Sequence, residues 1–167
     1  MMKKFLISLF LTGVSYVSYC QTPTDSVPKD PGSFAVYTVQ NFSFGAFSHG
    51  ASGGSVIISA DGTRSTTGTV NTYNMGVPFF QAIFEVEAAA NSIISILNGP
   101  DVTLTGSNGG SMLLHIGSST PASPFDVLVS PPQRTEVMIG GTLTVGSALN
   151  NPPGNYVGNV YITFNQQ

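Results

Sequence analysis

Strict alternation of apolar and polar residues near the C-terminus constrains this chain more than any other feature. The positions that share the apolar face are Tyr156, Gly158, Val160, Ile162 and Phe164. Because successive side chains of a β-strand point to opposite faces, this period of two predicts one half-buried antiparallel strand that runs almost to Gln167. The block GGTLTVG at residues 140–146 alternates in the same way. We therefore expect an all-β domain that is completed by its own C-terminal strand.

Further strands are predicted wherever short apolar runs lie between turn residues. They cover residues 34–40, 42–47, 55–59, 64–70, 79–87, 93–97, 101–105, 112–116, 125–129 and 136–145. Asp61 and Gly62 predict a hairpin turn, since glycine adopts the positive φ of a tight turn, and Gly53–Gly54 predicts a break. The run 85–91 is interpreted as a turn and strand edge despite its alanines. Turns at intervals of about ten residues are typical of a β-sandwich.

The first twenty residues have the composition of a secretory signal peptide. Lys3 and Lys4 precede an apolar stretch that is shorter than the roughly 20 residues needed to span a bilayer, and no later stretch approaches this length. We expect cleavage before Gln21, a flexible leader with three prolines at residues 21–33, and one folded domain at residues 34–167. The sequence thus predicts an exported protein in the periplasm, on the outer surface or outside the cell.

Cys20 is the only cysteine, and its place at the end of the signal leaves two outcomes open. A lipoprotein signal would lipidate this residue and anchor the protein to a membrane. Tyr19 favours the other outcome, removal of Cys20 with the signal, because lipoprotein processing requires a small residue before the cysteine. The mature chain would then hold no disulfide and would depend on burial alone for its stability.

Charged residues are scarce and mostly acidic. Without residues 1–20, three basic residues remain beside eight acidic ones, so the net charge is −5. Nucleic-acid binding and electrostatic attachment to anionic membranes both depend on clustered Lys and Arg. We expect neither kind of partner, and the sequence indicates no cofactor.

Five sequence blocks carry a family resemblance. They are FGAF, GGSVIISADGTRSTTGTV, FEV, GGTLTVG and PGNYVGNVYITFN, at residues 44–47, 53–70, 84–86, 140–146 and 153–165. Together they resemble the bacterial secreted family called domain of unknown function 4402, from about Phe34 over nearly all of the chain that follows. The resemblance implies an immunoglobulin-like antiparallel β-sandwich in a single domain.

More distantly, the early FG and the final PGxY-led strand are similar to spore-coat-U-type and chaperone-usher pilin subunits. In such pilins, an N-terminal strand from the next subunit completes an open sandwich. The one segment here that suits this role is residues 34–40, whose apolar positions include Phe34, Val36 and Val39. Two alternatives follow, because this strand either is donated to a neighbour or belongs to its own core.

No catalytic or metal-binding constellation is evident. His49 and His115 are isolated and are interpreted as surface residues, since zinc needs three or four suitably spaced ligands. Glu85 and Glu87 share one face of a strand, like a glycosidase carboxylate pair, but are interpreted as solvent-facing. Asp61 resembles the start of a calcium loop without the later acidic ligands, so we interpret it as a turn cap. We expect that the protein is not an enzyme.

Two further sites lie in expected loops. Ser26, in the triplet Asp-Ser-Val at residues 25–27, resembles an acceptor for O-glycosylation in the periplasm of certain bacteria. The loop at residues 150–154 leads to Tyr156 and is either a recognition tip or a turn that its prolines and Gly154 set. The suitability of each residue for turn chemistry favours the turn.

The sequence as a whole predicts an exported, non-catalytic structural or adhesive surface protein, alone or in a pilin-like fibre. Its partners would be further copies of itself or other surface proteins. The alternative is a periplasmic ligand- or carbohydrate-binding module, although the absence of tryptophan weakens a sugar-stacking site.

Overall fold

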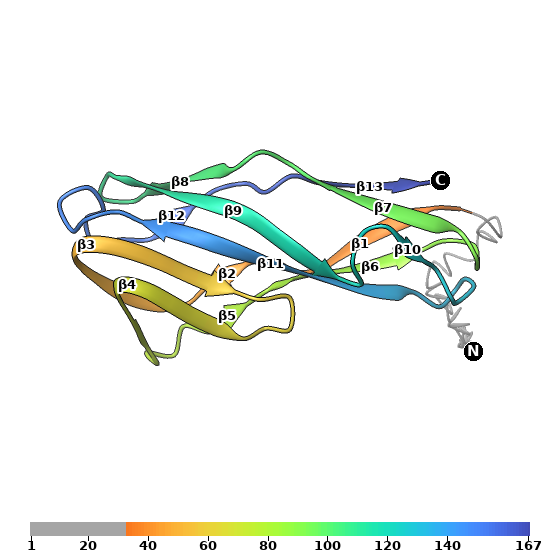
Figure 1. Cartoon of the computed structure of the whole chain (residues 1–167), viewed down its shortest axis with the longest axis horizontal. Helices are drawn as coiled ribbons and strands as arrows, with labels where there is room; N and C mark the ends of the chain where they lie inside the picture. The colour runs from red at the N-terminus through yellow and green to blue at the C-terminus, as the bar shows by residue number, and fades with distance from the viewer. Residues whose placement is uncertain (1–32) are drawn as a thin grey trace, which may run out of the picture.

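The computed structural model describes residues 33–167, and this part of the chain forms thirteen β-strands and no helix. Most strands run along the length of an elongated molecule, and the C-terminus lies at the end where the first strand begins (Figure 1). The described residues therefore offer no helix that could cross a membrane. The prediction of an all-β, antiparallel domain is confirmed.

An eight-stranded sheet forms the first layer, and β11 (Thr135–Val145) is its centre. On one edge, β11 pairs first with β6 (Ala82–Glu87) and then with β3 (Ala46–Ile58). Its other edge pairs with β9 (Ser111–Thr120). The outer strands are β1 (Ala35–Gln40) beside β6, β4 (Arg64–Tyr73) beside β3, β8 (Val102–Gly106) beside β9 and β12 (Tyr156–Val157) beside β8.

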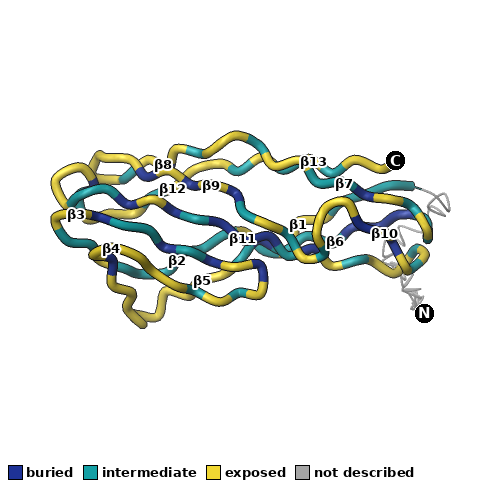
Figure 2. The backbone as a smooth tube through the Cα atoms, viewed as in Figure 1, coloured by how far each residue is buried: buried dark blue, intermediate teal, exposed yellow. Residues whose placement is uncertain are grey.

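Two small sheets form the second layer. One contains β10 (Phe125–Asp126), β7 (Ile93–Asn98) and β13 (Ile162–Gln166) in that order, and the other pairs β2 (Ser43–Phe44) with β5 (Phe79–Phe80). Their inward side chains pack against the large sheet, so the molecule is a β-sandwich. Buried residues follow β11 and its neighbours along the molecule (Figure 2).

The core consists of two clusters, one for each small sheet. The cluster against β7 and β13 includes fully buried residues from both layers, namely Val86, Ile94, Val127, Val137 and Ile139. The cluster against β2 includes Phe44, Val56, Leu104, Met112, Leu114 and Leu143. Phe42 and Val160 contact both clusters and join them into one core.

The side chains of the C-terminal segment point inwards and outwards as the alternation predicts, but the segment is not one strand. Its apolar side chains are half-buried, and the odd-numbered residues between them are exposed. The prediction of a continuous strand is wrong because β12 pairs with β8 in the large sheet and β13 pairs with β7 in the small one. Residues 158–161 cross between them. A Cβ atom at Gly158 would lie 2.5 Å from Cδ2 of Leu104, so glycine permits the chain to cross close to β8.

Other boundaries also differ from the prediction, and the predicted strand 42–47 is divided between β2 and the start of β3, which lie in different sheets. Gly53–Gly54 does not break the chain but forms a bulge inside β3, where the pairing with β4 shifts register; a bulge accommodates extra residues without ending the strand. The predicted strand 79–87 is two strands, β5 and β6, in different sheets. The predicted strand 125–129 shortens to β10.

Candidate functional site

A groove opens between the two small sheets of the second layer. One wall is the segment 41–47, which contains β2 and the start of β3, and the other is the segment 152–163, which contains β12 and the crossing to β13. The groove has a volume of about 1080 Å³. Core-facing side chains of the large sheet, including Leu104 and Met112, form its floor.

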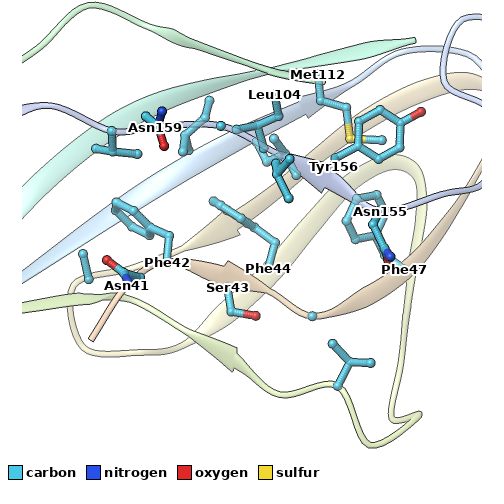
Figure 3. A pocket seen from close by; sticks show the side chains of 18 of the residues that line it. Asn41, Phe42, Ser43, Phe44, Phe47, Leu104, Met112, Asn155, Tyr156 and Asn159 are labelled. Atoms are coloured by element: carbon cyan, nitrogen blue, oxygen red, sulfur yellow. The ribbon is translucent and has the colours of Figure 1, made fainter. Parts of the chain in front are cut away.

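Aromatic side chains of the first wall point into this groove. The rings of Phe42 and Phe44 are stacked, with centroids 6.0 Å apart and an interplanar angle of 16°. Figure 3 shows both rings projecting from their segment towards Leu104 and the opposite wall. Their spacing of two residues places both on the same side of an extended chain. Phe47, from the start of β3, extends the apolar surface.

The first wall is anchored from behind by Arg64 of β4. Its Nη1 atom donates a hydrogen bond of 3.1 Å to the carbonyl oxygen of Phe44, and its guanidinium lies 4.1 Å from the ring centroid of Phe79. The hydroxyl of Ser43 donates a hydrogen bond of 2.7 Å to the carbonyl oxygen of Pro78. These contacts fix β2 to the segment before β5 and to β4 of the large sheet.

Asn151 anchors the start of the second wall, although its side chain is only 1% exposed. Its Oδ1 atom accepts a hydrogen bond of 2.5 Å from the amide of Gly146, and its Nδ2 atom donates one of 2.6 Å to the carbonyl oxygen of Ser111. Its carbonyl oxygen lies 3.0 Å from Nε2 of His49, which must be the donor. Asn151 thus connects this wall to β3, β9 and β11.

The loop after Asn151 is held by its own turn contacts. The hydroxyl of Tyr156 donates a hydrogen bond of 2.7 Å to the carbonyl oxygen of Pro152. A Cβ atom at Gly154 would lie 2.7 Å from the hydroxyl oxygen of Ser107. These contacts hold the loop in its turn, and the same residues, Pro152, Gly154 and Tyr156, also line the groove.

The two histidines differ in their surroundings. His115 is a surface residue, as interpreted from the sequence, with a side chain 67% exposed and Nδ1 2.7 Å from the carboxylate of Asp101. For His49 that interpretation is wrong, because its Nδ1 atom is buried without a hydrogen-bond partner. The hydrogen bond to Asn151 draws this side chain inwards.

Glu85 and Glu87 lie on the same side of β6, but the prediction that both face solvent is wrong. Glu87 is 4% exposed. Arg134 covers it, with Nη1 2.8 Å from Oε2 of Glu85 and Nε 3.2 Å from Oε2 of Glu87. The guanidinium also lies 3.8 Å from the ring centroid of Tyr37. Two hydrogen bonds raise the pKa of Arg134 above its ordinary value, and the one to Glu85 contributes more than the one to Glu87.

Asp61 caps its own turn. Its Oδ1 atom accepts hydrogen bonds from the hydroxyl and the amide of Thr63, at 2.7 and 2.9 Å, and Gly62 has a φ of +83°. Both hydrogen bonds lower the pKa of Asp61, and the one from the hydroxyl of Thr63 contributes more than the one from its amide. Within residues 33–167, no three His, Cys, Asp or Glu side chains are grouped so that they could hold a metal ion.

The candidate donor strand lies in the sheet of its own chain. β1 pairs with β6 from Ala35 opposite Glu87 to Gln40 opposite Ile83. Phe34 and Val36 pack against the core, whereas Val39 is 56% exposed. The signal peptide, Cys20, Ser26 and the leader up to residue 32 lie outside the described residues.

The groove has walls of neutral residues. Among the described residues that line it, none is Asp, Glu, Lys or Arg, and the polar ones are Asn, Ser, Thr, Tyr and one His. Such walls suit an apolar or neutral occupant, because burying an unpaired charge is costly. No sequence motif marks this groove as a site, although the alternation of FSFGAF is a local signal for its aromatic wall.

Comparison with known proteins gives one match. The family model described as "Domain of unknown function (DUF4402)" matches residues 34–165, in agreement with the resemblance of the sequence blocks. Neither a curated protein nor a solved structure matches the chain.

Proposed function

The chain belongs to this DUF4402 family, whose description assigns no activity, and from its geometry we propose that it is an exported, non-catalytic structural or adhesive surface component that holds a partner in its groove. The observation that carries this proposal is the opening in the second layer, between residues 41–47 and 152–163. The signal-like residues 1–20 support export. A pilin-like place in a larger assembly is consistent with such an opening.

The chemistry of the walls favours binding of a partner over catalysis. General acid–base catalysis uses titratable groups close to the reacting atoms. Here the walls present aromatic rings, asparagines and main-chain groups, and the carboxylates of Glu85 and Glu87 are paired with Arg134 away from the groove. A partner would gain stability by covering the half-buried Phe42 and Phe47, since burial of apolar surface contributes about 25 cal/mol per Å².

A charged residue in the groove tests this proposal. Asn41 is exposed and lines the first wall (Figure 3), so Asn41→Lys would place a charge where an apolar partner packs. Asn71→Lys, at an exposed position of β4 outside the groove, is the matched control. We expect light scattering after size-exclusion chromatography to find the wild-type and Asn71→Lys proteins from the native cell envelope in complexes, and Asn41→Lys as a monomer. Persistence of the complexes in Asn41→Lys would refute the proposal.

A small-molecule site is the second candidate. The groove volume of about 1080 Å³ is near the upper end of ligand pockets, and its walls are rich in aromatic rings. A periplasmic ligand-binding module would bind an apolar compound or a glycan as a monomer. Mass spectrometry of the protein released from the native envelope distinguishes the two candidate functions. A ligand-binding module would carry a bound small molecule, whereas a component of an assembly would carry a second polypeptide.

A further inference from the structure

We infer that the occupant of the groove is a single β-strand of another polypeptide, extended and neutral, with apolar side chains at alternate positions. It would pair with the free edge of the segment 156–166 and complete the second layer. The inference rests on the proposed function, because it names the chemistry of the partner that the groove holds.

The hydrogen bonds of β13 show which main-chain groups are free. The amide of Gly99 donates a hydrogen bond of 2.9 Å to the carbonyl oxygen of Tyr161, and the amide of Gln167 donates one of 2.9 Å to that of Ile93. The odd-numbered residues of this segment therefore direct their main-chain groups towards β7. Because these groups alternate between the two edges of an antiparallel strand, Ile162 and Phe164 direct theirs towards the opposite edge.

The same argument applies to β12. The amide of Ser107 donates a hydrogen bond of 2.9 Å to the carbonyl oxygen of Asn155, so Asn155 faces β8. Tyr156, the next residue, directs its main-chain groups towards the groove. In the described part of the chain, β12 and β13 are each the last strand in their order, and no strand pairs with this edge.

A strand at this edge would fill the groove with its side chains. The segment 156–163, which is the larger part of the second wall, is eight residues long and would span roughly 26 Å at about 3.3 Å per residue. A partner strand of common length fits beside it. Its inward side chains, every second one, would lie over the rings of Phe42 and Phe44, in the space between the two walls (Figure 3).

The walls also define the charge of the partner. The groove lining in the described residues contains no Asp, Glu, Lys or Arg, so an inward charge on the partner would be buried without a counter-charge. The exposed main-chain edge favours a peptide over a compact apolar molecule, since only an extended chain satisfies successive N–H and C=O groups.

A different polypeptide fits better than a second copy. β1 is the neutral alternating strand at the start of the described chain, and it already pairs with β6 while Phe34 and Val36 pack in the core. A second copy would have to vacate its own sheet to donate this strand. The leader at residues 21–33 contains three prolines, which cannot donate main-chain hydrogen bonds.

Peptide binding to the full protein, followed by amide hydrogen exchange, tests the inference. The probes are synthetic nine-residue peptides that alternate Val, Ile, Leu or Phe with Ser or Thr, and matched peptides with Asp at two apolar positions. We expect the neutral peptides to bind at least about tenfold more tightly than the Asp peptides. Binding should slow exchange of the amides of Tyr156, Ile162 and Phe164 and leave that of Thr163 unchanged. Asn41→Lys should weaken binding about tenfold, and Asn71→Lys should not.

Three outcomes would overturn the inference. In the first two, no neutral peptide binds, or peptides bind without slowing exchange at Ile162 and Phe164. In the third, these amides become protected in the protein alone as its concentration rises, which would assign the edge to a second copy. If Asn41→Lys abolishes the envelope complexes while no peptide protects these amides, the proposed function stands and the strand inference fails. If the complexes persist, the proposed function itself fails.

Discussion

The two halves of this sandwich use the same large sheet but cover it to different extents. In the half below β7 and β13, Ile94, Val137 and Ile139 are fully buried between the layers, and the rings of Phe84 and Phe164 pack with centroids 5.3 Å apart. In the half that contains β2 and β5, the second layer is interrupted by the groove. The difference shows where the second layer is incomplete: it is continuous as far as the free edge of β13, and it is interrupted beside β2, although the core residues there are buried.

Deletion of core methyl groups should produce the largest effect, and a larger one in the closed half. We expect Ile139→Ala to lower the free energy of unfolding by about 2–5 kcal/mol, because it leaves a cavity between the layers. Leu104→Ala should cost less, about 2 kcal/mol, because its side chain adjoins the groove and no enclosed cavity forms. Urea denaturation measures both values. Equal losses would show that the groove half is packed as tightly as the closed half.

Loss of Asn151 should be the next largest effect, and it tests how the open half is held. Asn151→Ala removes two side-chain hydrogen bonds and leaves the amide of Gly146 and the carbonyl oxygen of Ser111 without these partners. We expect a loss of about 1–3 kcal/mol in urea denaturation. Asn150→Ala, at the exposed neighbouring position, is the control and should change stability little. A stable Asn151→Ala protein would show that the second wall does not depend on this anchor.

Arg134→Met tests the surface of the closed half. It removes the guanidinium that covers the buried Glu87, so we expect it to lower the free energy of unfolding measured by urea denaturation. Adding Glu87→Gln should recover part of the loss, because the buried charge that the guanidinium neutralises is then absent. Glu85→Gln, at a carboxylate 37% exposed, should cost about 0–1 kcal/mol. If the double variant is no more stable than Arg134→Met, the guanidinium does not act by compensating Glu87.

The smallest effect is expected at Asp61, and it depends on pH. Hydrogen bonds from Thr63 lower the pKa of this carboxyl from 3.8 in the folded state, so ionised Asp61 stabilises the hairpin at pH values above 3.8. This stabilisation is lost as the pH falls through the lowered pKa. Asp61→Asn should therefore be less stable than the wild type at neutral pH and equal to it in strong acid. A difference that grows towards acid would contradict the assignment.

Local periodicity predicted the local features of this fold. The inward direction of Ile162 and Phe164 follows from the alternation of a strand, and the turn at Asp61–Gly62 follows from the chemistry of two adjacent residues. The same alternation did not show that β12 and β13 join different sheets. That outcome depends on their pairing with β8 and β7, which lie at least fifty residues earlier in the chain.

Contacts between distant residues explain the remaining differences. Glu87 is buried because Arg134, 47 residues later, covers it, and Asn151 is buried because Ser111, 40 residues earlier, accepts its hydrogen bond. The groove lies between segments that are more than 100 residues apart in sequence. The FSFGAF alternation indicates an apolar face at one wall, but no local pattern shows that the opposite wall comes from residues 152–163.

Amide hydrogen exchange of the monomer is the most direct test of the open second layer. The account predicts a strict alternation along β13, with slow exchange at Thr163 and Asn165, whose amides face β7, and fast exchange at Ile162 and Phe164, whose amides lie on the free edge of the strand. Equal protection of Ile162 and Phe164 in the monomer would contradict it, because the edge would then already be paired within the chain.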